Sequence, residues 1–89
     1  MITDEDKKII IDTAARYRAT RVVLFGSCLS SDRESRDIDI GVEGVADKDF
    51  FAFYGDLLFA LSKPVDVVDL SERSRFVELV RQEGIPIYA

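Results

Sequence analysis

The strictly alternating stretch DIDIGV at residues 37–42 constrains the fold of this chain more than any other feature. Because successive side chains of a strand point to opposite faces, Asp37 and Asp39 share one face, and Ile38 and Ile40 belong to the other. A carboxylate inside a strand destabilises the fold unless it faces water or binds something. The stretch therefore predicts a half-buried strand whose polar face is either solvated or a binding site.

Further strands are predicted by short apolar runs that end at turn residues. Two runs rich in β-branched residues lie at 21–26 and 65–70, and a final short run lies at 85–89. Such runs are typical of strands, and helical patterns separate them along the chain. We predict one α+β domain over residues 1–89, with the order α-β-α-β-α-β and room for a short helical turn after Ser27.

Three helices are predicted from residue spacing and from start and stop signals. Thr3 with Asp6 three residues later indicates a capping box, and the first helix continues to about residue 18. The second covers about 48–62, with Asp47 as its cap and Pro64 as its stop. The third covers about 72–83 and ends at a glycine, and its apolar stripe is predicted to contain Phe76, Leu79 and Val80.

Composition excludes several kinds of chemistry and partner. The chain has no histidine and one cysteine, so histidine-based catalytic triads and most zinc sites are excluded. Its net charge of −5 argues against long nucleic acid as a partner. Apolar runs far shorter than a membrane span and a polar N-terminus predict a cytoplasmic protein with no membrane partner. Oxygen-ligated cations, phosphate recognition or binding without chemistry remain.

Three carboxylates are the candidate metal ligands. On one strand face, Asp37 and Asp39 lie about 7 Å apart at Cα, close enough to hold one divalent ion or to bracket two. The alternative is a solvated face with these residues paired to Arg33 or Arg36. Asp66 interrupts a β-branched run, so it either lies in water at a strand end or converges on the first two. Asp69 falls on the opposite face of that strand by alternation, and its expected role is that of a solvated or capping residue.

Gly26 and Ser27 are candidate phosphate-binding residues, because they follow the strand predicted at 21–26. Glycine lets a backbone approach a ligand closely, and a serine at the start of a helical turn offers donors to a phosphate. A turn alone also explains Gly-Ser. The next residue, Cys28, has no histidine or lysine nearby in the sequence to activate it, so we interpret it as a small loop residue.

Together these motifs resemble a known family. The segments LFGS (24–27), DIDIGV (37–42), PVDVVDL (64–70) and RQEGIPIY (81–88) are similar, in this order, to the minimal nucleotidyltransferases of prokaryotes, within the DNA polymerase β-like superfamily. The resemblance covers about residues 20–89. It implies a small mixed sheet with helices packed mainly on one face, and Mg²⁺-dependent transfer of an NMP, first of all AMP from ATP, to a hydroxyl.

The resemblance also implies roles for individual residues. Asp37 and Asp39 would ligate two Mg²⁺ ions, Asp66 would complete the metal site and help to activate the attacking hydroxyl, and Gly26 with Ser27 would hold the triphosphate. Family members usually carry G-S-x-x-R-G, whereas Ser30 and Ser31 occupy the last two positions here. Arg36, or Arg33, is then expected to supply the missing positive charge.

Two alternative functions remain open at this stage. If the altered loop abolishes nucleotide binding, the chain is a binding module that neutralises its partner by contact. The other alternative is a transferase that modifies a small molecule such as an aminoglycoside, for which 89 residues leave little room.

The second predicted helix carries more apolar surface than one face can bury. Phe50, Phe53, Leu57 and Leu61 form one stripe, but Phe51, Leu58 and Phe59 fall outside it. Either the helix is covered on both sides within the domain, or its second face binds a partner. The resemblance implies which partner this is, because minimal nucleotidyltransferases often occur as antitoxins beside a small helical HEPN toxin.

Overall fold

The computed structural model describes residues 2–26 and 37–89, and three helices and four strands lie within these ranges. In chain order they are α1 (Asp4–Arg16), β1 (Arg21–Phe25), β2 (Ile38–Glu43), α2 (Asp47–Ala60), β3 (Val65–Asp69), α3 (Arg75–Glu83) and β4 (Ile85–Tyr88). Among the described residues the order is therefore α-β-β-α-β-α-β, which has one strand more than the predicted α-β-α-β-α-β. The strands β1 and β2 pair as antiparallel neighbours, and such a pair needs no helical crossover. The short helical turn predicted after Ser27 lies outside the described residues.

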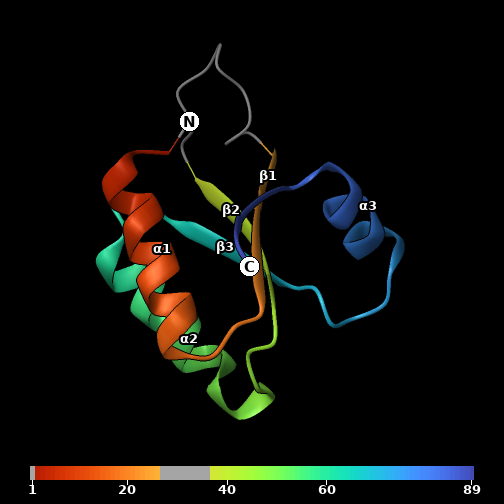
Figure 1. Ribbon diagram of the computed structural model, residues 1–89, viewed down its shortest axis with the longest axis horizontal. Coiled ribbons are helices and arrows are strands. Elements are labelled where there is room, and N and C mark those ends of the chain that lie inside the picture. Colours follow the sequence, from red (N-terminus) through yellow and green to blue (C-terminus); the bar gives the residue numbers. More distant parts are fainter. Residues whose placement is uncertain (1, 27–36) are drawn as a thin grey trace.

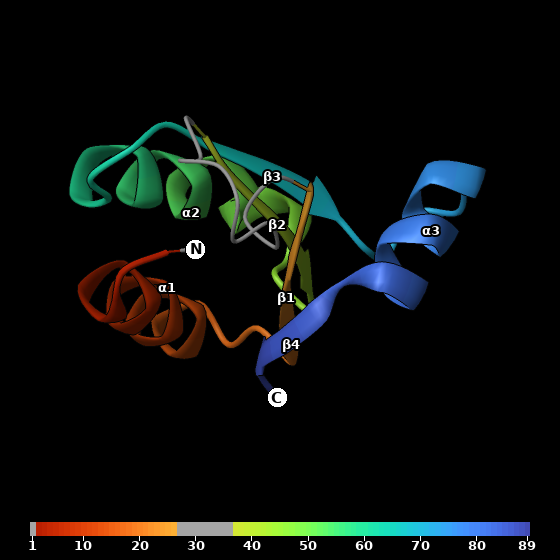
Figure 2. The same ribbon diagram turned by 90° about the horizontal axis from the view of Figure 1, so that it is seen from above.

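The strands form one mixed sheet in the order β3-β2-β1-β4. Figure 1 shows β3, β2 and β1 side by side, and Figure 2 shows β4 beside β1. β1 is antiparallel to both β2 and β4, whereas β2 and β3 are parallel and α2 connects them. A parallel pair requires such a crossover, and α2 supplies it. The predicted α+β fold with a mixed sheet is confirmed.

The two faces of the sheet are covered differently. α1 and α2 lie together on one side and α3 lies on the other (Figure 2). We call the first side the closed face; its side chains include Val22, Leu24, Ile38, Ile40 and Val65, all in the main core. We call the second side the open face; its side chains include Val23, Phe25, Asp39, Asp66 and Val68. Strand alternation assigns neighbouring residues to these two faces.

α1 is fixed at its start by local and long-range hydrogen bonds. Thr3 is the N-cap, and its side-chain oxygen accepts a hydrogen bond from the Asp6 amide at 3.1 Å, as the capping-box pattern predicts. The Asp6 carboxylate is buried and does not reach back to the cap; it accepts from the amide and the hydroxyl of Ser62. The helix ends at Arg16, two residues before the predicted end.

α2 packs along α1 and over the sheet. Its Phe53 and Leu57 are fully buried, and the ring of Tyr17, the residue that caps the end of α1, meets Phe53 edge to face with centroids 5.7 Å apart. The predicted cap at Asp47 is wrong, because Ala46 occupies the cap position and no side chain caps this end. Asp47 is instead the first helical residue, where a carboxylate interacts favourably with the helix dipole.

α3 begins later than predicted, because Ser74 rather than a residue near 72 caps it. The Ser74 hydroxyl accepts a hydrogen bond from the Val77 amide at 3.1 Å. Val77 and Val80 are the buried pair, so the predicted stripe is correct at Val80 and wrong at Phe76 and Leu79, which are about half exposed. The helix has only nine residues and covers only part of the open face.

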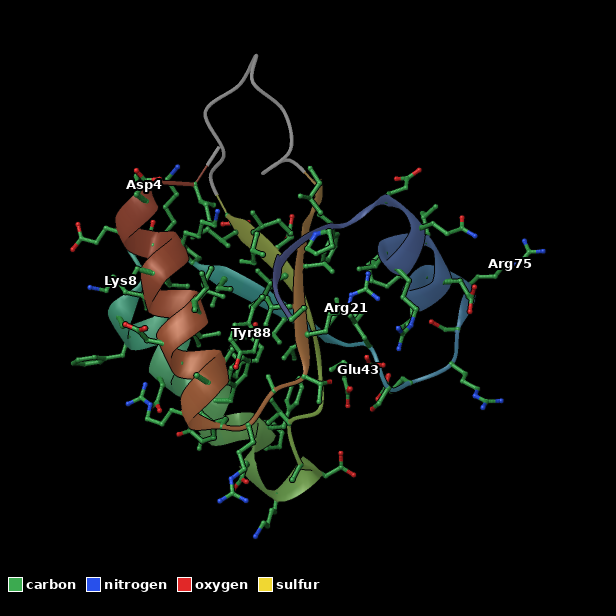
Figure 3. All side chains as sticks on the ribbon, in the orientation of Figure 1. Asp4, Lys8, Arg21, Glu43, Arg75 and Tyr88 are labelled. Carbon is green, nitrogen blue, oxygen red and sulfur yellow. The ribbon has the colours of Figure 1, made fainter. Side chains whose placement is uncertain are left out.

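A polar contact fastens α3 to the sheet. Arg81 donates hydrogen bonds to the carboxylate of Glu43 and to the carbonyl of Leu70. Glu43 ends β2, at the opposite end of that strand from Ile38, and Arg75 at the start of α3 points away from the sheet (Figure 3). Within the described ranges, no helix is long and apolar enough to cross a membrane.

Candidate active site

Asp39 and Asp66 lie side by side on the open face. Asp39 is the third residue of the predicted alternating stretch, and it is the register partner of Asp66 on the parallel neighbour β3. Residues paired in this way project to the same face of a sheet. Asp39 is half-buried and Asp66 is exposed. Two carboxylates that are separated by 26 intervening residues are thereby brought to one place, as the predicted convergence requires.

The electrostatics of this pair are unfavourable without a ligand. The pKa of Asp39 is raised above its ordinary value, first by burial, then by the negative charges of Asp66 and Asp37, and finally by a hydrogen bond with Asp66 that favours the protonated form. Like charges held this close repel each other. A bound cation would relieve that repulsion, so the site has the charge distribution of a cation site.

Gly26 holds the end of β1 against the Asp39 carboxylate. Its φ of 69° lies in the left-handed region, which favours glycine, and a Cβ placed there would stand 2.5 Å from Oδ2 of Asp39. Phe25, the preceding residue, is the register partner of Asp39 on the antiparallel neighbour. The backbone at Gly26 therefore lies close beside the Asp39 carboxylate, and a side chain at this position would displace Asp39.

Tyr54 is a site residue that sequence reasoning missed. It lies on α2, and its hydroxyl makes hydrogen bonds with the Asp66 carboxylate and the Val67 backbone. Burial raises the Tyr54 pKa most, followed by the charge of Asp66 and that hydrogen bond, while the Val67 contact lowers it. The helical pattern did not predict this role, because a tyrosine next to Phe53 in an apolar helix is expected to be one more aromatic residue of the core.

The remaining predicted residues fall in different places. Asp37 is exposed just before β2, near enough for its charge to act on Asp39. Asp69 lies on the face opposite to Asp66, as alternation predicts, and its carboxylate accepts from the amide of Ser71 at 2.9 Å. The two other residues expected at the triphosphate, Ser27 and Arg36, lie outside the described residues, as do Cys28, Ser30, Ser31 and Arg33.

The carboxylates in the described part of the site are of the ligand type that Mg²⁺ binds. Among residues 2–26 and 37–89, no group of three acidic or cysteine side chains is clustered tightly enough to hold a metal ion. Mg²⁺, however, is commonly bound by one or two carboxylates together with substrate phosphates and water. The pair Asp39 and Asp66, with Asp37 nearby, supplies the hard oxygen donors that this mode of binding needs.

The fold agrees with the family to which the sequence belongs. The family model described as polymerase beta nucleotidyltransferase matches residues 8–89, which is nearly the whole chain. The chain is therefore a member of the polymerase β-type nucleotidyltransferase family. A comparison with curated proteins gave no match.

Solved structures place the chain more narrowly among similar proteins. A minimal nucleotidyltransferase is 30% identical with a TM-score of 0.71, and the match covers 90% of this chain and 87% of that one. A toxin–antitoxin complex with AMP-PNP contains a chain that is 26% identical with a TM-score of 0.76. That match covers 98% of this chain and 74% of the other. A third structure is a Shewanella oneidensis complex of a tri-AMPylated HEPN toxin with an MNT antitoxin. It contains a chain that is 24% identical with a TM-score of 0.72, and the match covers 94% of this chain and 70% of that one. This similarity shows a shared fold.

Proposed function

We propose that this chain is an Mg²⁺-dependent nucleotidyltransferase that transfers an NMP, first of all AMP from ATP, to a tyrosine hydroxyl of a HEPN toxin partner. The observation that carries the proposal is the pairing of Asp39 with Asp66 across β2 and β3, with the backbone of Gly26 against the Asp39 carboxylate. The related toxin–antitoxin structure with AMP-PNP and the AMPylated toxin of the Shewanella complex support the choice of nucleotide and acceptor.

Each described residue has a chemical role in this proposal. Asp37 and Asp39, with Asp66, would hold up to two Mg²⁺ ions, which when bound stabilise negative charge on the transferred phosphoryl group and on the leaving group. Asp66 accepts the proton of the attacking hydroxyl, whose oxygen forms a bond to the α-phosphorus. The bond between that phosphorus and the bridging oxygen breaks, and pyrophosphate leaves in line with the attack. Gly26 leaves room for the phosphates.

The partner surface in this proposal is the outer side of α2. Phe51 is 87% exposed and Phe59 is 94% exposed, and half-exposed Leu58 lies on the same helix. Large aromatic side chains exposed together mark an interaction site more often than a free surface. The related antitoxin structures contain HEPN toxins, which supports a helical protein as the partner. Neither Phe51 nor Phe59 belongs to the core of the domain.

Transfer of label from α-labelled ATP to the purified HEPN partner tests the proposal. Asp39→Asn should lower transfer by about a thousandfold or more, because several kcal/mol of charge stabilisation depend on that carboxylate. The matched control is Asp12→Asn, which removes an exposed carboxylate of α1 on the closed face and should leave transfer unchanged. Undiminished transfer by the Asp39 variant would contradict the proposed chemistry.

A second measurement separates transfer from neutralisation by contact. The double variant Phe51→Ala, Phe59→Ala should weaken the toxin complex at least about tenfold while leaving Mg²⁺-ATP binding intact. If the wild-type chain binds the toxin tightly but binds no nucleotide, the result would favour the alternative of a binding module that neutralises its partner by contact. Ser30 and Ser31, which replace the usual Arg-Gly, are the reason for considering that alternative.

A further inference from the structure

Asp66 lies at a place where the sheet alone does little to orient its side chain. In the described part of the chain β3 is an edge strand with β2 beside it, and Asp66 is exposed. The hydrogen bond between Asp66 and Asp39 needs a proton shared by the two carboxylates. Two ionised carboxylates only accept hydrogen bonds, so Asp39 cannot orient Asp66 when both are charged. A donor from elsewhere in the fold is therefore of interest.

Tyr54 on α2 supplies such a donor. Burial raises the pKa of Tyr54 most, followed by the charge of Asp66 and the hydrogen bond with it, so the hydroxyl stays protonated at neutral pH and donates to the carboxylate. The contact with the Val67 backbone lowers the pKa of Tyr54, so there the hydroxyl accepts from the Val67 N–H. The phenol oxygen is thus held by two successive residues of β3.

The backbone of β3 explains how a helix of the closed face reaches a carboxylate of the open face. The Ile38 amide donates to the carbonyl of Pro64 at 2.8 Å, so the even-numbered residues of β3 turn their backbone groups toward β2. Residues that face the neighbouring strand alternate with residues that face away, so the Val67 amide points to the outer edge. Tyr54 therefore meets β3 around that edge, and its ring packs against the main core.

The position of the Tyr54 ring fixes the direction of its donor. Satisfying the amide of an edge strand requires only the acceptor side of the hydroxyl. Its single proton is directed to Asp66, and hydrogen bonds to an ionised carboxylate are about twice as strong as those between neutral groups. The contact thus has the features of a support for Asp66 and not only of a cover for the edge of the sheet.

We propose that Tyr54 is a positioning residue whose hydroxyl, fixed by the Val67 amide, holds the Asp66 carboxylate in the orientation that accepts the proton of the attacking hydroxyl. The inference rests on the proposed function and deepens it, because it names the residue that controls the proton acceptor of that site. Groups that take part in catalysis must be held to within about 0.5 Å, and a hydrogen bond from a rigid helix provides that precision.

The variant Tyr54→Phe tests the proposal because it removes only the hydroxyl oxygen. The kcat for transfer to the HEPN partner should fall about tenfold to a hundredfold, since a misplacement of about 1 Å can cost about a hundredfold. The KM values for ATP and for the toxin should change by less than about threefold. The matched control is Tyr17→Phe, which removes a hydroxyl that donates to Asp56 of the same helix at 2.6 Å and should leave kcat unchanged.

Two further measurements separate positioning from a general structural effect. In an Asp66→Ala background, Tyr54→Phe should lower the residual transfer by less than about twofold, because no carboxylate remains to be oriented. In the metal-free chain at neutral pH, carbon-13 NMR of the side-chain carboxylates should show a shifted Asp66 signal in Tyr54→Phe and an unchanged one in Tyr17→Phe.

The outcomes distinguish this inference from the proposed function. An equal loss of transfer in both backgrounds, or an unmoved Asp66 signal, would overturn the positioning role. An unchanged kcat with a raised KM for the toxin would overturn it too and would assign Tyr54 to the partner surface, because Phe51 and Leu58 lie one helical turn to either side. Label on Tyr54 itself would overturn it and make this residue an acceptor. A wild-type chain that transfers no label would remove the proposed function, and the Asp66 signal would then test the positioning contact by itself.

Discussion

The two faces of the sheet share the same four strands but differ in what covers them. On the closed face, α1 and α2 bury the larger apolar core, which includes the fully buried Phe53 and Leu57. On the open face, α3 covers only a small cluster around Val23, and the rest carries Asp39, Asp66 and Gly26. The closed face supplies the stability that allows the open face to keep charges close together.

The largest effect on stability is expected for a substitution on the closed face. Phe53→Ala should destabilise the domain by about 3–5 kcal/mol, because it removes a fully buried ring and leaves a cavity. Phe59→Ala on the same helix is the matched control, and it should change the free energy of unfolding by no more than about 0.5 kcal/mol because that ring is exposed. Urea denaturation measures both values. Similar losses for the two variants would contradict the conclusion that the stability of the domain depends on the rings buried on the closed face.

Two glycine-to-alanine substitutions, one at the candidate site and one in α2, should change the free energy of unfolding in opposite directions. Gly26→Ala should cost about 1–2 kcal/mol, because its φ is positive and the new Cβ would meet the Asp39 carboxylate. Gly55→Ala, within α2, should stabilise the domain by about 0.5–1 kcal/mol, because a methyl group there would point into open space. Nucleotide binding should fall only for Gly26→Ala. A stabilising effect at Gly26 would show that the open face tolerates a side chain there.

The smallest effect on stability is expected when the charge of Asp39 is removed. Because its folded-state pKa is raised, the folded protein binds that proton more tightly than the unfolded chain, so the contribution of Asp39 to metal-free stability should increase as the pH falls through that raised pKa toward the ordinary value. Asp39→Asn should slightly raise the melting temperature at neutral pH and flatten this pH dependence. Mg²⁺-ATP should raise the melting temperature of the wild type only. A lower melting temperature for Asp39→Asn would indicate that this charge stabilises the fold.

Much of the fold follows from local sequence patterns, and the misses have local causes. The alternation in 37–42 correctly predicts β2, and Thr3 correctly predicts the start of α1. The cap predicted at Asp47 and the helix start predicted near 72 are wrong, because the backbone path places Ala46 at the cap of α2 and Ser74 at the cap of α3. No local pattern fixes that path to the residue. The stripe predicted for α3 fails at Phe76 and Leu79, because helical spacing does not reveal how little of the sheet that short helix covers.

The sequence by itself determined which residue types were present for chemistry and which elements would carry them. Its carboxylates, its glycine after a strand and its lack of histidine predict a site of hard oxygen donors and phosphate contacts, because those properties belong to the residues themselves. Only the tertiary structure decided that Asp39 and Asp66 are register partners and that Tyr54 contacts Asp66. Strand pairing and helix packing join residues far apart in the chain, and no local pattern encodes those distances.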